Sequence, residues 1–336
     1  MKVTCDSCGY RRAVVYQPHT GRRLCRECFL EDVKARAREE IRRWGMISEG
    51  DTILMGLSGG KDSYVMLDVL VEVHKPSRLI GVSIIEGIPG YNREDDVRKL
   101  VSHAKERGVD VIVTSIREYT GHSLFDIVRI ARSRGATHAP CTFCGISRRR
   151  ILNKYARMYG ANKTATAHNL DDEAQTAVVN LLRGDIVGLL RQHPLSPPMS
   201  KLVIPRIKPL RKIYEWETAT YALINKYPMQ ETECMFINQA PTLRARVRQA
   251  LYELEANSPG VLLRIMEHLD KILASEAKKL KVMELPRCVK CGEPTSYNRR
   301  MCKLCEILEE AGIEKPLYTI PEMLRRARLS VASEPI

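Results

Sequence analysis

The chain has 336 residues, of which 44% are hydrophobic and 28% charged, a balance typical of a globular protein with an apolar core. No apolar run approaches the roughly 20 residues that a membrane span needs, so membrane-spanning proteins are excluded. The formal net charge of +14 favours a polyanionic partner such as nucleic acid. Because a cysteine pair follows directly after residues 1–4, we expect no signal peptide, a cytoplasmic protein without membrane association, and reduced cysteines.

Short apolar runs alternate with helical patterns through the middle of the chain. A first helix is expected over 31–44. The pattern then predicts strands over 52–57, 79–85, 109–116 and 163–167, and helices over 62–74, 95–107 and 170–183. A further strand is expected over 202–207, and helices near 215–226, 242–255 and 260–281. A basic helix is also expected to begin near Arg148, after the C-x2-C pair at 141–144. Alternating strands and helices predict an α/β fold, in which helices cover a parallel, Rossmann-like sheet.

The eleven cysteines divide into two groups of four and one group of three. Each group of four consists of two C-x2-C pairs, the spacing that lets four thiolates surround one zinc ion. These quartets are Cys5, Cys8, Cys25 and Cys28, and Cys288, Cys291, Cys302 and Cys305. The remaining cysteines, Cys141, Cys144 and Cys234, are one short of a closed site. They could hold a metal centre with an open coordination position, or carry out redox sulfur chemistry directly.

The string Ser58-Gly59-Gly60-Lys61-Asp62-Ser63 follows the first predicted strand and opens its helix. Two glycines allow successive backbone N–H groups to face an anion, and the helix N-terminus adds its dipole. The spacing does not fit the Walker pattern. The string instead resembles the PP-loop of N-type ATP pyrophosphatases. This resemblance implies cleavage of ATP between the α- and β-phosphates and adenylation of an oxygen on the substrate.

A second string, HNLDDEAQT at 168–176, follows the fourth predicted strand. On its own it is typical of a helix with an acidic first turn. After a PP-loop, it resembles the matching motif of the tRNA-modifying members of that superfamily. The resemblance implies that Asp172, with Asp62, positions Mg²⁺ and the nucleotide. No partner spacing supports a metal-binding role for His168, which we leave unassigned.

The motifs follow one another along the chain in this order: a cysteine quartet, SGGKDS, a single C-x2-C pair, HNLDDEAQT, a distant single cysteine and the second cysteine quartet. This order resembles the tRNA 2-thiouridine synthetases of the TtuA and NcsA type along essentially the whole chain. The resemblance implies two Zn²⁺ in the quartets and a 4Fe–4S cluster on Cys141, Cys144 and Cys234, with one iron open to sulfur. It also implies that ATP and tRNA are bound, that uridine O2 is adenylated, and that sulfur delivered at the cluster replaces it.

The resemblance also assigns residues to ATP and to catalysis. The residues implied to contact ATP are Gly56, Ser58, Gly59, Gly60, Lys61, Asp62, Ser63, Ile84, Arg148 and Ala167. The residues implied to be catalytic are Cys141, Cys144, Cys234 and Asp172. We further expect tRNA phosphates to contact Arg11, Arg12, Arg148, Arg149, Arg150, Arg244, Arg246 and Arg248. The other expected partners are a second copy of the chain and a sulfur donor, which is either a ubiquitin-like carrier protein or free sulfide.

The strings CTFCGISRR and MCKLCE resemble the branch of the family that modifies wobble uridine 34. The branch that modifies uridine 54 usually carries lysine at the position of Arg148, and it remains the alternative substrate. A cluster-free mechanism, with a persulfide on Cys141 or Cys234, also stays open. So does an inactive RNA-binding zinc protein, although Lys61, Asp62 and Asp172 argue against it. An amidating ATP pyrophosphatase would leave the three spare cysteines without a purpose.

The expected domains follow from the same motifs. We expect a zinc finger over 1–30, a linker helix over 31–49 and the catalytic domain over 50–284. A second zinc finger over 285–310 and a tail over 311–336 complete the chain.

Overall fold

The computed structural model describes residues 3–91, 94–230, 232–237 and 242–313. Most of the tail expected over 311–336 lies outside these residues. None of the helices in the described part is long and apolar enough to span a membrane.

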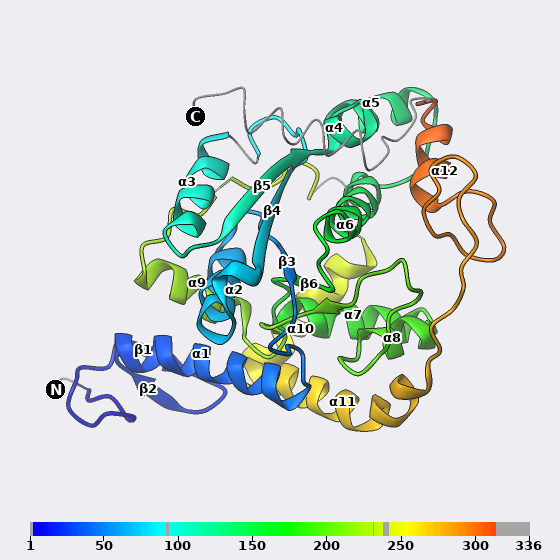
Figure 1. Ribbon diagram of the computed structural model, residues 1–336. Helices are drawn as coiled ribbons and strands as arrows, with labels where there is room; N and C mark the ends of the chain where they lie inside the picture. The colour runs from blue at the N-terminus through cyan, green and yellow to red at the C-terminus, as the bar shows by residue number, and fades with distance from the viewer. Residues whose placement is uncertain (1–2, 92–93, 231, 238–241, 314–336) are drawn as a thin grey trace.

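A five-stranded parallel sheet forms the centre of the molecule, in the order β5-β4-β3-β6-β7 (Figure 1). Its strands are β3 (Ile53–Gly56), β4 (Leu79–Ile85), β5 (Asp110–Ser115), β6 (Lys163–Thr166) and β7 (Arg206–Ile207). The α/β prediction is therefore confirmed. The strand expected over 202–207 is wrong in its first four residues, because only Arg206–Ile207 pairs with β6. Pro205, directly before it, has no N–H to donate to a sheet.

Helices cover both faces of the sheet (Figure 1). They are α1 (Arg26–Arg43), α2 (Lys61–Val73), α3 (Glu94–Lys105), α4 (Ile116–Thr120), α5 (Leu124–Ser133), α6 (Pro140–Met158), α7 (Leu170–Leu182), α8 (Ile186–Gln192), α9 (Glu215–Ile224), α10 (Leu243–Asn257), α11 (Val261–Lys279) and α12 (Lys303–Glu310), with a 3-10 turn at Pro76–Arg78. Successive side chains of a strand point to opposite faces. Ile53 and Met55 of β3 accordingly join the core beneath α1 and α2, whereas Leu54 joins the core beneath α5 and α6.

The two cysteine modules lie at opposite ends of the fold (Figure 1). The first contains a small antiparallel hairpin, β1 (Val15–Gln17) with β2 (Arg22–Leu24), which leads into α1. Helix α1 begins at Arg26 rather than at the expected residue 31, because Cys25 serves as its N-cap. The second module packs with α12 against α5 and α6. Glu293 of this module is buried and forms ion pairs with Arg150 and Arg157 of α6.

Helix α6 positions the middle cysteines. We expected the C-x2-C pair to precede a helix that starts near Arg148, and this prediction is wrong. The helix begins at Pro140, at a position where the fixed φ of proline favours the first turn. Cys141 and Cys144 therefore lie one turn apart at the start of α6, followed on the same helix by Arg148.

Candidate active site

A cavity of about 280 Å³ opens at the carboxyl ends of β3, β4 and β6, where a parallel α/β sheet usually binds its ligand. Eight residues predicted to contact ATP or to act in catalysis line it: Gly56, Ser58, Asp62, Ser63, Ile84, Arg148, Ala167 and Asp172. The sequence analysis did not identify six other lining residues as part of the ATP site: Gly145, Arg149, Leu152, Thr166, His168 and Arg206. Strand topology therefore brings together motifs that are about a hundred residues apart in the chain.

The phosphate loop is held by its own hydroxyl groups. Ser63 Oγ accepts a hydrogen bond from Ser58 N at 2.9 Å, and the two serine Oγ atoms are 2.9 Å apart. Gly59 has φ +79°, a conformation that other residues rarely adopt, and Gly60 is the N-cap of α2 and provides no capping side chain. The first N–H groups of α2 thus have no capping side chain, as expected of a site that receives an anion.

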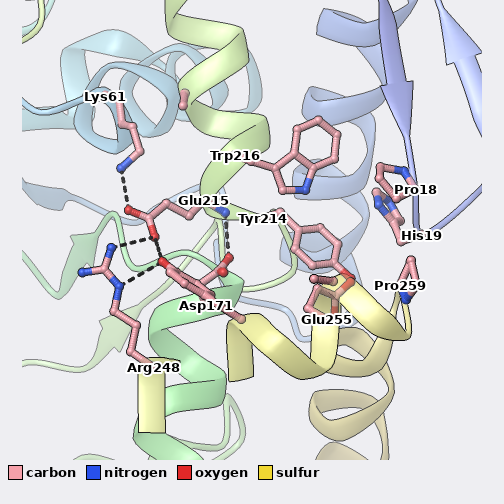
Figure 2. A pocket seen from close by; sticks show the side chains of 13 residues that line it. Pro18, His19, Lys61, Asp171, Tyr214, Glu215, Trp216, Arg248, Glu255 and Pro259 are labelled. Carbon is pink, nitrogen blue, oxygen red and sulfur yellow. Dashed lines mark hydrogen bonds and ion pairs between the residues drawn. The ribbon is translucent and has the colours of Figure 1, made fainter. Parts of the chain in front are cut away.

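Lys61 does not line this cavity. Its Nζ lies 3.2 Å from Asp62 Oδ2 and 3.1 Å from Glu215 Oε1, and its side chain borders a neighbouring cavity instead (Figure 2). Burial opposes the charge on Lys61, but the two carboxylates outweigh it and raise the pKa of the lysine. In this conformation Lys61 is paired with protein carboxylates, and its approach to a phosphate requires a rotation of the side chain.

Two carboxylates of the cavity are close enough to interact electrostatically. Asp62 Oδ1 accepts hydrogen bonds from Thr218 at 2.6 Å and Asn169 at 3.3 Å. Asp172 Oδ1 lies 3.0 Å from the Arg244 guanidinium. Burial raises the pKa of Asp172; Arg244 opposes the shift, and the charge of Asp62 adds to it. Carboxylate oxygens that repel one another at a phosphate site are suitable ligands for Mg²⁺.

The opposite wall of the cavity is basic. Arg148 lies 3.5 Å from the buried Glu86. Arg149 and Arg206 have no carboxylate within ion-pair distance among the described residues, so their charge is available to a bound anion. His168 accepts or donates one hydrogen bond, to Thr166 Oγ1 at 2.9 Å. Burial lowers the pKa of His168 to about 4, which makes this histidine neutral at physiological pH.

One of the arginines expected to contact tRNA has a different role. Arg150 forms an ion pair with Glu293 at 2.9 Å, and its side chain is only 12% exposed. This position excludes Arg150 from the tRNA contacts predicted for the 148–150 run. Successive residues of a helix point about 100° apart, so three neighbouring arginines cannot face one ligand.

The three middle cysteines lie in one region of the molecule. Cys144 and Cys234 pack against the same core, and ionised Cys141 would raise the pKa of both. Burial raises the pKa of Cys144 to about 12. Among the described residues, the sulfurs of these three are not gathered as closely as those of a zinc site. Cysteine thiolates are the usual protein ligands of iron–sulfur clusters, so the chemistry of these three side chains suits such a group.

The two quartets do gather around single points. In each, all four sulfurs lie within 4.8 Å of one another. Four thiolates at this spacing, with no open position, fit a tetrahedral zinc ion. The sequence prediction that each quartet forms one cluster of ligand atoms is confirmed in its geometry.

Comparisons with known proteins agree with this arrangement. Residues 4–30 match the family model of the 2-thiouridine synthetase TtuA N-terminal LIM domain, and residues 31–255 match that of the PP-loop domain. The chain is 32% identical to cytoplasmic tRNA 2-thiolation protein 1 of Danio rerio, over 100% of this chain and 96% of that protein. It is 33% identical to tRNA 2-thiolation protein NcsA of Haloferax volcanii, over 91% of this chain and 98% of that protein.

A solved structure has the same fold. The U34-tRNA thiolase NcsA from Methanococcus maripaludis, determined with its [4Fe-4S] cluster, superposes with a TM-score of 0.74 and 28% sequence identity. The alignment covers 95% of this chain and 100% of that one. The family models together match most of the chain, and the relatives align over nearly all of it. The chain belongs to the TtuA/NcsA family of PP-loop proteins, which includes the cytoplasmic tRNA 2-thiolation proteins.

Proposed function

We propose that this protein is an ATP-dependent tRNA uridine 2-sulfurtransferase that acts on wobble uridine 34. The observation that carries the proposal is a single cavity bordered by the phosphate loop, by Asp62 and Asp172, and by the helix that carries Cys141 and Cys144. ATP activation and sulfur transfer need these groups side by side. The names of the relatives, which are tRNA 2-thiolation proteins and a U34-tRNA thiolase, support the substrate and the position.

The first half of the reaction uses residues of the cavity. Backbone N–H groups of 58–63 bind the pyrophosphate portion of ATP, Asp62 and Asp172 hold Mg²⁺, and Arg148 contacts phosphate. The adenosine lies against Gly56, Ile84 and Ala167. Uridine O2 attacks the α-phosphorus, the bond to the bridging oxygen breaks, and pyrophosphate leaves. The uridine then carries AMP on O2, which turns a poor leaving group into a good one.

The second half replaces O2–AMP with sulfur at carbon 2. We propose that Cys141, Cys144 and Cys234 hold a 4Fe–4S cluster, which supplies an iron without a protein ligand where sulfur can be positioned. The alternative mechanism has no cluster and carries the sulfur as a persulfide on Cys141 or Cys234. An anaerobically purified sample separates the two mechanisms. Absorbance near 400 nm with about four irons per chain supports the cluster, and its absence supports a persulfide on Cys141 or Cys234.

The remaining assignments complete the proposal. Each quartet binds one structural Zn²⁺, in zinc fingers over 1–30 and 285–310 that flank the linker helix and the catalytic domain. The sulfur donor is a ubiquitin-like carrier protein or free sulfide, and the enzyme works as a homodimer in the cytoplasm. The name of the Danio rerio relative, cytoplasmic tRNA 2-thiolation protein 1, supports this location.

Mass spectrometry of tRNA nucleosides from a deletion strain tests the proposal. Loss of 2-thiouridine derivatives at position 34, restored by the wild-type gene but not by a gene encoding Asp172→Asn, is the expected result. Loss at position 54 instead would move the activity to the other branch of the family. Unchanged thiouridine at both positions would refute the proposed function.

A further inference from the structure

A second cavity, of about 510 Å³, lies next to the active site and has no role in the reaction described above. Five parts of the chain build it: the β1–β2 turn, the N-termini of α2, α7 and α9, and α10 with the residues that follow it (Figure 2). Its lining residues are Pro18, His19, Lys61, Asp171, Tyr214, Glu215, Trp216, Ala219, Arg248, Tyr252, Glu255, Ala256 and Pro259. Because Lys61 belongs to the phosphate loop, the cavity adjoins the ATP site directly.

One end of this cavity is aromatic (Figure 2). The His19 ring lies 4.7 Å from that of Tyr214 and 6.2 Å from that of Trp216, measured between centroids. The His19 side chain is 3% exposed; its Nε2 lies 3.8 Å from the buried Glu217 carboxylate, too far for a hydrogen bond, and neither ring nitrogen has a hydrogen-bond partner among the described residues. Burial lowers the pKa of His19, so the ring is a neutral donor and acceptor. Buried polar groups in native proteins are usually paired, and this histidine therefore points to a missing ligand.

The other end is charged (Figure 2). Glu215 accepts a hydrogen bond from Lys61 at 3.1 Å and another from Tyr252 at 2.5 Å. The Arg248 guanidinium lies over the Tyr252 ring, 5.2 Å from its centroid, and 3.9 Å from Glu215. Arg248 is half-exposed, at 47%, and it can reach an anion at the mouth of the cavity without losing its place on the ring.

The carboxylates of the cavity already have donors from the protein. Glu255 accepts hydrogen bonds from the Tyr214 hydroxyl at 2.9 Å and from Gly260 N at 2.5 Å. Asp171 accepts one from Glu215 N at 2.7 Å. These acids therefore hold the walls in place and do not require a cationic ligand. What remains for a ligand is a largely apolar wall with a cation at its edge, in which Trp216 is half-buried and Tyr214 and His19 are buried behind it.

We propose that this cavity binds one unpaired base of tRNA, with the phosphate of that nucleotide at Arg248. The inference rests on the proposed function and adds a second nucleotide site to it. Single-stranded RNA is recognised by aromatic side chains that stack on bases turned out of the strand, with arginine at the backbone. The volume lies within the range of small-molecule sites, about 300–1,000 Å³, and admits a base with its ribose. Lys61 lies between this nucleotide and the one whose O2 is activated.

Tryptophan fluorescence tests the inference, because the chain has only two tryptophans, Trp44 and Trp216. The variant Trp44→Phe leaves Trp216 in the cavity as the sole reporter. An anticodon stem–loop RNA is titrated into this protein, and RNA binding is measured in parallel by filter retention. Stacking of a base should quench the Trp216 fluorescence, with a midpoint that coincides with the filter-binding midpoint.

Two matched variants show whether the cavity itself holds the base. Ala256→Leu, added to Trp44→Phe, fills part of the cavity; Ala250→Leu makes the same change on the same helix at a position that does not line it. Ala256→Leu should abolish the quenching and weaken RNA binding on the order of tenfold, with ATP binding unchanged. Ala250→Leu should behave as its parent.

Each other outcome overturns a specific claim. If the RNA binds but leaves Trp216 fluorescence unchanged, or if Ala256→Leu binds and is quenched like Ala250→Leu, the base site does not exist, and the proposed function is untouched. If the stem–loop does not bind the parent protein at concentrations that saturate tRNA-binding enzymes, both the base site and the proposed function are wrong.

Discussion

Lys61 Nζ lies 3.1 Å from Glu215 Oε1, so the lysine of the phosphate loop is paired across the neighbouring cavity rather than aimed at the nucleotide (Figure 2). Glu215 is also the first residue of α9, where its backbone N–H is held by Asp171 at 2.7 Å. The pair therefore links the start of α2 to the start of α9. Binding of a phosphate by Lys61 has to compete with this carboxylate.

The first prediction concerns that competition. Glu215→Gln removes the negative charge and keeps a hydrogen-bond acceptor, so it should free Lys61 for ATP. Ion pairs at this exposure are worth roughly 0–1 kcal/mol, which limits the gain to about fivefold tighter ATP binding. Equilibrium ATP titration measures it, with Glu309→Gln, which removes the partner of the surface residue Lys290, as the control. Weaker ATP binding in Glu215→Gln would mean that the pair supports the nucleotide site.

The second prediction concerns the attachment of the C-terminal module. Glu293 is buried and forms ion pairs with Arg150 and Arg157, whose side chains are 12% and 17% exposed. Its change to glutamine leaves two partly buried cations without a counter-charge, at a cost of about 3 kcal/mol in the free energy of unfolding. Urea denaturation measures this cost. A loss as small as that of Glu309→Gln, within about 0.5 kcal/mol, would contradict the structural role.

The third prediction is a pH dependence. Burial lowers the pKa of His168 to about 4, whereas an unfolded histidine titrates near 6.5. Between these values the unfolded chain holds one more proton than the folded protein, so this residue destabilises the fold as the pH falls. His168→Gln removes the effect. From pH 7 to pH 5, the free energy of unfolding of the wild type should fall by about 2 kcal/mol more than that of the variant.

Urea denaturation of both proteins at each pH provides the comparison. Asp171 has the opposite shift, since burial raises its pKa to about 6, but it is present in both proteins and cancels in the difference. A difference that does not change between pH 7 and pH 5 would show that His168 is accessible to protons in the folded state.

The sequence predicts the sheet well and the walls of the cavity less well. Buried parallel strands are short apolar runs, and for that reason β4 (Leu79–Ile85) is predicted to the residue. The phosphate loop and Asp172 are likewise found from local strings. Arg206 and Gly145 carry no such signal, because they reach the cavity only through the pairing of β7 with β6 and the docking of α6 on the sheet.

The arginine run of α6 shows what helical geometry adds. As a string, Arg148, Arg149 and Arg150 read as one basic patch. In the helix, Arg148 and Arg149 both line the cavity, with Arg148 also close to Glu86, whereas Arg150 pairs with Glu293. The sequence does contain a periodic signal for the role of Arg150, because Arg157 lies seven residues beyond it and thus on the same face of the helix. It becomes usable only once the start of α6 is known.

The fourth prediction separates sulfur transfer from ATP activation. Cys234→Ala should bind ATP and tRNA as the wild type does, since this residue does not line the nucleotide cavity. It should lose the absorbance near 400 nm and the thiolation activity, because two thiolates hold a cluster poorly. Thiolation at the wild-type rate, with a full cluster after reconstitution, would show that the three-cysteine site does not exist.

The most direct measurement of the central claim is thiolation by the purified protein under anaerobic conditions. A tRNA transcript is incubated with ATP, Mg²⁺ and sulfide, and its nucleosides and the released nucleotides are quantified by mass spectrometry. The account predicts 2-thiouridine at position 34, with one AMP formed per thiouridine, and no product with α,β-methylene-ATP or with Asp172→Asn. Formation of thiouridine without AMP would contradict this account. So would formation of AMP and ADP without thiouridine by a protein whose cluster is intact.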